Sequence, residues 1–206
     1  MRHAQIVMIV LLAGLGLART SWAQSPAGGL KLTGTSTVGD WTCREPTIQP
    51  APSSPGGLPG PQPAGEPSPH GMTLVFPVRD IECGNALMND HLRQALKADR
   101  HPTISFSLPS DQLQRAVQAV SAPVVVDGTL TIAGRTEPVQ TEVTATPMPD
   151  RGLRVQGEQV LRMSEFGVKP PRLLLGTLEV RDLVRVAFDL VLRGPVVALL
   201  GRHPQF

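Results

Sequence analysis

The sequence lacks the residues and spacings that mark the common catalytic sites. It has no tyrosine, no Gly-x-Ser-x-Gly elbow, no His-Glu-x-x-His pair and no phosphate-binding loop. An active site needs a nucleophile, a base and a group that orients the base. The histidines that follow the N-terminal segment are scattered, at His70, His91, His101 and His203. Asp90 and His91 are neighbours on a predicted helix and point in different directions. The sequence therefore predicts that the protein is not an enzyme.

Cysteine is also scarce, with only Cys43 and Cys83. No Cys-x-x-Cys or His-x-His accompanies them, so the pair makes a poor metal site, and we expect neither a metal nor a cofactor. In an oxidising compartment the two cysteines are expected to form a disulfide, which would contribute about 4 kcal/mol by restricting the unfolded chain. The alternative is two free thiols, which are uncommon in such compartments.

The longest apolar run is too short for a membrane anchor. It extends over residues 6–17, after the basic Arg2, and Arg19 ends it before the roughly 20 residues that a spanning helix requires. Ser21 and Ala23 place small residues where a signal peptidase cuts. We predict that residues 1–23 are a signal peptide and that the protein is exported to the periplasm. No later segment is long enough for a transmembrane helix.

An excess of charge is missing as well. The predicted signal takes two of the 19 basic residues and none of the 17 acidic ones, so the exported part carries 17 of each sign. No run of basic residues occurs, and a neutral chain has no general reason to bind nucleic acid or an anionic membrane surface. Its length suits one domain. The oligomeric state stays open, a dimer included.

Proline, by contrast, is abundant over residues 44–70, where nine prolines fall between Pro46 and Pro69. Proline cannot donate to a β-ladder, and this density resists helix and sheet alike. We predict a mobile loop inside the domain. A proline-rich partner motif is the alternative, but no basic anchor accompanies it.

The rest of the chain alternates apolar and polar residues with the period of β-strands. A first strand is expected over residues 30–41. Further alternating segments begin near Met72, Ile104, Val126, Val139, Leu153 and Val184. One amphipathic helix is predicted over residues 85–97, with Asn85 as its cap and an apolar stripe of Met88, Leu92 and Leu96. Six or more strands with one apolar face indicate an antiparallel sandwich or barrel, and the single helix favours the barrel.

Several segments are similar to the YceI-like family of periplasmic lipid- and polyisoprenoid-binding proteins. They are GTSTVGDW at 34–41, GN at 84–85, MNDH at 88–91, ALKADRHPTISF at 95–106, GTLTIAGRTEPV at 128–139, SEFGV at 164–168 and VAF at 186–188. They occur in the family's order and place a YceI-like domain over residues 30–193. The sequence departs from the family at Gly39, where many relatives have histidine, in the proline-rich stretch, and in the tail of residues 194–206.

The resemblance implies a mainly β protein, an extended antiparallel lipocalin-like β-barrel of about eight strands with one amphipathic helix. It also implies that an isoprenoid-type lipid, such as a quinone or polyprenyl carrier, lies in the barrel lumen without being chemically changed. Candidate lumen residues are those on the inward faces of the predicted strands and helix: Leu74, Phe76, Met88, Leu92, Ile104, Phe106, Leu130, Ile132, Val143, Val155, Leu161, Val186, Phe188 and Leu190.

One other interpretation remains open. The same inward side chains also suit a dry barrel core, because the inward residues of small barrels usually pack against one another. The protein would then be an interaction module of the cell envelope, with the proline-rich loop and residues 195–200 as partner contacts.

Overall fold

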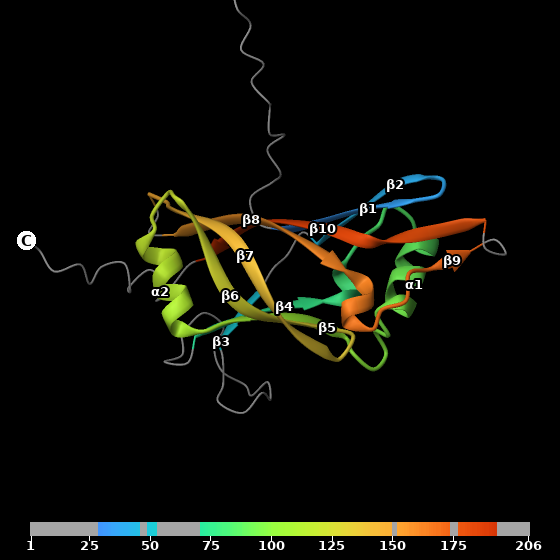
Figure 1. The fold of residues 1–206 in the computed structure, drawn as a ribbon, viewed down its shortest axis with the longest axis horizontal. Helices are drawn as coiled ribbons and strands as arrows, with labels where there is room; N and C mark the ends of the chain where they lie inside the picture. The colour runs from blue at the N-terminus through green and yellow to red at the C-terminus, as the bar shows by residue number, and fades with distance from the viewer. Residues whose placement is uncertain (1–28, 46–48, 53–70, 150–151, 174–176, 193–206) are drawn as a thin grey trace, which may run out of the picture.

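The fold is a curled antiparallel sheet with a helix at each end, seen in a computed structural model (Figure 1). The structure describes residues 29–45, 49–52, 71–149, 152–173 and 177–192. The strands are β1 (Gly29–Ser36), β2 (Gly39–Glu45), β3 (Gln49–Pro52), β4 (Met72–Pro77), β5 (Thr103–Leu108), β6 (Pro123–Ile132), β7 (Arg135–Pro147), β8 (Leu153–Arg162), β9 (Arg172–Leu173) and β10 (Leu178–Leu192). The helices are α1 (Ala86–Ala95) and α2 (Ser110–Gln118), with short 3-10 turns η1 (Val78–Asp80) and η2 (Met163–Phe166).

The strands follow the order β2-β1-β10-β8-β7-β6-β5-β4-β3, and β9 pairs with the start of β10. Two of the ten strands, β3 and β9, have four residues or fewer, which leaves eight longer strands. The predicted lipocalin-like antiparallel barrel of about eight strands is confirmed. Alternation sets its inner face: in β4, Met72, Leu74 and Phe76 are buried while the residues between them are partly exposed.

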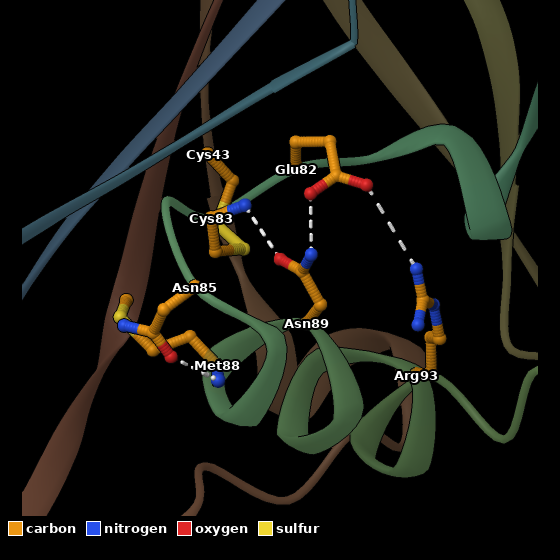
Figure 2. Close-up of a disulfide and its surroundings, with 7 residues drawn as sticks. All are labelled: Cys43, Glu82, Cys83, Asn85, Met88, Asn89 and Arg93. Atoms are coloured by element: carbon orange, nitrogen blue, oxygen red, sulfur yellow. Dashed lines mark hydrogen bonds and ion pairs between the residues drawn. A yellow bond between two sulfur atoms is a disulfide. The ribbon is translucent and has the colours of Figure 1, made fainter.

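A covalent bond and a single backbone bridge join β2, one end of the long sheet, to the segment that follows β4. Strand β2 pairs only with β1 in the described part of the chain, but Arg44 and Glu82 exchange two backbone hydrogen bonds of 2.8 Å. Beside this bridge, Cys43 on β2 forms a disulfide with Cys83, which follows β4 (Figure 2). The predicted disulfide is confirmed. It closes the seam between β2 and the segment that follows β4.

Helix α1 begins next to the disulfide. The Asn85 side chain accepts a 2.9 Å hydrogen bond from the Met88 amide, as predicted for the cap. Asn89 is buried; its side-chain oxygen accepts from the Cys83 amide at 2.7 Å, and its side-chain nitrogen donates to Glu82 (Figure 2). The helix ends at Ala95, two residues before the predicted end, because Leu96 closes its last turn and Lys97 has φ of 55°.

The prediction of a single helix is wrong, because α2 connects β5 to β6. It buries Leu113, Ala116 and Val117, which recur at helical spacing, against β6 and β7. The helix has only nine residues, and Pro109 stands in its cap position in place of a polar capping side chain. Its apolar stripe is therefore short, and the acidic Asp111 in its first turn is the one start signal that the sequence offered.

Two predictions about the first strands are also wrong. The single strand expected over residues 30–41 is a hairpin of β1 and β2, which turns at Thr37 and Val38 and leaves the turn at Gly39 with φ of 138°. Part of the predicted loop over residues 44–70 is ordered as β3, which pairs with β4 at the edge of the sheet. Proline is tolerated in an edge strand because that strand has one unpaired side. The remainder of this loop, at 46–48 and 53–70, lies outside the described residues.

The predicted signal peptide (1–23) and tail (194–206) also lie outside the described residues. Neither α1 nor α2 is long and apolar enough to cross a lipid bilayer.

Candidate functional site

A cavity of about 440 Å³ is lined by residues of α1, of α2 and of the strands between them. This volume lies in the range of roughly 300–1,000 Å³ found for small-molecule sites. Apolar side chains from the inward faces of the strands form nearly all of its wall. All fourteen sequence-predicted lumen residues line it: Leu74, Phe76, Met88, Leu92, Ile104, Phe106, Leu130, Ile132, Val143, Val155, Leu161, Val186, Phe188 and Leu190. The structure therefore brings the candidate set together around one space.

Helix α2 covers one end of this cavity. Its residues Leu113, Ala116 and Val117 line the space and are each less than 7% exposed. Leu108, where β5 ends, and Leu153, where β8 begins, are equally buried beside it. Because the lining residues at this end are buried and apolar, the cavity is closed there.

The other end of the cavity is bordered by exposed residues, and we call it the mouth. Its border consists of Ser36, Val38, Gly39 and Asp40 from the β1–β2 hairpin, His91 from α1 and Arg162 from the end of β8. Val38, Gly39, Asp40 and Arg162 are exposed, although all of them line the cavity. Figure 1 shows that the β1–β2 hairpin, α1 and β9 lie together at this end, opposite α2. The cavity thus opens in one direction.

Polarity in the described lining is concentrated towards the mouth. The polar lining side chains are Ser36, Asp40, His91, Thr141, Gln159 and Arg162. Four of them border the mouth, and Gln159 lies three residues from the end of β8. Thr141, in the middle of β7, is the exception. A molecule that matched this distribution would be apolar along most of its length and polar at one end.

Three strand glycines let aromatic rings lie along the wall of the cavity. The Phe188 ring, on β10, reaches across to Gly157 on β8, and the Phe106 ring, on β5, reaches Gly128 on β6. Trp41 lies over Gly34, its direct partner in the β1–β2 ladder, so that a Cβ on Gly34 would be only 2.9 Å from the indole nitrogen. Because the tips of these rings contact the neighbouring strand, the rings leave room along the barrel axis.

The indole nitrogen of Trp41 is a buried polar atom beside the cavity. It has no hydrogen-bond partner in the described part of the chain, and Trp41 itself is a lining residue. Buried donors in proteins are usually satisfied, so an unpaired one costs about 1–3 kcal/mol. A hydrogen-bond acceptor on a bound molecule would recover part of this cost.

The sequence-based candidate set omitted several lining residues. Leu30, Leu32 and Trp41 come from the hairpin that was read as a single strand, and Leu113 comes from the helix that was not predicted. Alternation of Leu30 and Leu32 with polar residues was a signal for the first two. The glycine positions gave no signal by themselves, because their aromatic partners are fixed by strand register.

One close pair of charged groups lies outside the cavity. The pKa of Arg154 is raised, chiefly by its side-chain hydrogen bonds to Asp189 at 2.8 and 2.5 Å and then by the charge of that carboxylate. Neither residue lines the cavity; the pair joins β8 to β10 on the outer face. Among the described residues, no group of three or more His, Cys, Asp or Glu side chains is placed to hold a metal ion.

Comparison with known proteins supports one relationship. A model of the YceI-like domain matches residues 33–192. Among solved structures, the chain is similar to a polyisoprenoid binding domain from Saccharophagus degradans implicated in plant cell wall breakdown, with 15% identity, a TM-score of 0.59, and coverage of 80% of this chain and 92% of that one. It is also similar to Burkholderia cenocepacia BcnA, with 19% identity, a TM-score of 0.52, and coverage of 80% and 96%. A search of curated proteins found no relative. At these identities the structural likeness concerns the fold.

Proposed function

The chain belongs to the family of YceI-like domains, and from this membership we propose that it binds one elongated apolar lipid in the cavity of its barrel. The ligand in this proposal has an isoprenoid tail and is a quinone or a polyprenyl lipid. The observation that carries the proposal is the apolar cavity itself, which is closed at α2 and open at the mouth. The name of the Saccharophagus degradans domain, a polyisoprenoid binding domain, agrees with this ligand class.

The physical chemistry of such a tail fits this wall. An isoprenoid tail offers almost no hydrogen bonds, so its site must be apolar along the tail and polar only near the headgroup. Burial contributes about 0.8 kcal/mol for each methylene, so some 20 buried carbons would give about 16 kcal/mol before the costs of association. That value approaches the practical limit of non-covalent affinity. Partial burial of a long tail is therefore sufficient for tight binding.

The distribution of polar residues in the lining also predicts how the ligand is oriented in the cavity. We place the tail towards α2, where Leu113 and Val117 close the cavity, and the headgroup at the mouth, beside His91 and Arg162. The unpaired indole N–H of Trp41 is a candidate donor to a carbonyl or hydroxyl oxygen of the ligand.

The proposal assigns the protein a carrier role in the periplasm and no reaction. Its disulfide agrees with an oxidising compartment. A binding protein needs specific contacts around its ligand but no nucleophile or base. The described lining contains one histidine, His91, and the neighbouring carboxylate of Asp90 pairs with Arg93.

Narrowing the cavity tests the proposal. Val143→Phe and Val155→Phe place larger side chains on the inner face of β7 and β8, so each should reduce the saturable uptake of an isoprenoid quinone from detergent micelles. Val160→Phe is the matched control, because Val160 is exposed on β8 and does not line the cavity. Circular dichroism should be the same for all three variants and the parent protein.

Uptake that is equal in the inward and outward variants would contradict binding in the lumen. If the parent protein takes up no isoprenoid quinone or polyprenol at all, the carrier proposal fails and an interaction module with a dry core replaces it.

A further inference from the structure

The two most exposed large apolar side chains of the described residues both lie at the mouth end of the barrel. Val38 is 71% exposed and Leu87 is 66% exposed, whereas the other four exposed large apolar residues, Val120, Val125, Val160 and Leu183, lie between 45% and 48%. Single apolar residues at a surface are ordinary. The coincidence of the two largest exposures with the opening of the cavity calls for an explanation.

Val38 is held at the tip of the β1–β2 hairpin by a turn whose polar groups are satisfied. The Ser36 hydroxyl donates to the Gly39 carbonyl at 2.8 Å, and the Val38 amide donates to the Ser36 hydroxyl at 3.3 Å. The neighbouring Thr37 amide donates to the Glu179 carbonyl at 3.0 Å, which fixes the hairpin to β10. The turn therefore does not need an apolar side chain at Val38, yet it projects one into solvent.

Leu87 lies on the same side of α1 as a residue of the mouth. It precedes His91 by four positions, and residues at this spacing are neighbours on a helix surface. His91 borders the mouth, while Leu87 does not line the cavity. Leu87 is thus placed just outside the opening, on the helix that forms one of its sides.

We propose that the mouth is a membrane-docking surface, at which Val38 and Leu87 enter the outer part of a lipid bilayer and the ligand passes directly between bilayer and cavity. This inference rests on the proposed function. A long apolar tail that crossed water would expose every methylene, so the cost of an aqueous route rises with tail length. Docking at the mouth keeps the tail in an apolar environment throughout the transfer.

The charges around the mouth indicate which kind of lipid bilayer the protein can dock on. The border of the mouth carries the acidic Asp40 and the basic Arg162, and α1 adds Asp90 and Arg93, which lie on either side of His91 and form an ion pair. No charge of one sign dominates these residues. Docking should therefore depend on apolar insertion, proceed on electrically neutral bilayers and change little with salt.

Transfer from neutral phosphatidylcholine vesicles loaded with an isoprenoid quinone tests this proposal. Leu87→Gln should slow transfer to the full-length exported protein by about tenfold, the factor that corresponds to 1.4 kcal/mol of lost interfacial binding. Uptake of the same quinone from detergent micelles should be unchanged, because Leu87 is outside the cavity. Val120→Gln is the matched control, since Val120 is also exposed but follows α2 at the closed end.

The two proposals fail in distinguishable ways. If the Leu87→Gln variant takes up quinone from vesicles at the rate of the parent protein, membrane docking is overturned and lumen binding stays intact. The same holds if transfer occurs only when a second protein is added. Absence of uptake from micelles by the parent protein would refute lumen binding, and docking with it.

Discussion

At the scale of single residues, the contact between Gly34 and Trp41 shows how this barrel keeps a cavity although large aromatic side chains face inward. The indole lies over the Cα of Gly34, and the nearest atoms to a Cβ at that position all belong to Trp41. Glycine is therefore required at position 34, because the indole leaves no room for a larger side chain. The same relation holds where Phe188 covers Gly157, although there a backbone carbonyl is also close.

We expect Gly34→Ala to lower the free energy of unfolding by about 1–3 kcal/mol, because the new methyl group overlaps the indole. Trp41→Val in the same background should recover most of this loss, since the shorter side chain frees the space above residue 34. Urea denaturation of the two single variants and the double variant gives the interaction free energy. If the effects of the two substitutions on the free energy of unfolding simply add, the packing of the Trp41 ring does not depend on Gly34.

At the scale of secondary-structure elements, the seam between β2 and α1 has only one backbone bridge among the described residues. Strand β2, at one end of the sheet, is joined there to the segment that follows β4 by one backbone bridge, between Arg44 and Glu82, together with the disulfide and the buried Asn89. Longer ladders hold most of the other strands, such as the ten paired positions between β8 and β10. The disulfide therefore fastens both the barrel and the helix that forms one side of its mouth.

Cys43→Ala together with Cys83→Ala should lower the free energy of unfolding by about 4 kcal/mol, because the unfolded chain is then released from a loop of 40 residues. Amide hydrogen exchange should increase first in α1 and β2, on either side of the seam. Protection that falls equally across β6 and β7, far from the disulfide, would contradict the role given to the seam.

The elements also show what the sequence can and cannot predict. Alternation identifies the inward residues in β4 and β7 and, less strictly, in β10, because a period of two fixes the face of each strand. The helix α2 was missed because it has only nine residues with a short apolar stripe, and because Pro109 stands in its cap position in place of a polar residue. The closed and open ends of the cavity could not be predicted, because they depend on which elements meet in space.

At the scale of the whole molecule, the structure combines an apolar interior, one closed end and one polar opening. The sheet supplies the wall, α2 closes it, and α1 with the β1–β2 hairpin borders the mouth. The outward ion pair of Arg154 and Asp189 stays on the other side of the wall and contributes to the scaffold. This arrangement suits a ligand that is long, apolar and polar at one end only.

Native mass spectrometry of the protein, purified without detergent from a bacterial periplasm, is the most direct test of lumen binding. The account predicts a species heavier than the polypeptide by the mass of one lipid, and organic extraction should release a single isoprenoid quinone or polyprenyl compound. The Val155→Phe variant, prepared in parallel, should carry less of it. A mass equal to that of the bare polypeptide in repeated preparations, with no saturable uptake of added isoprenoid lipid, would contradict the account.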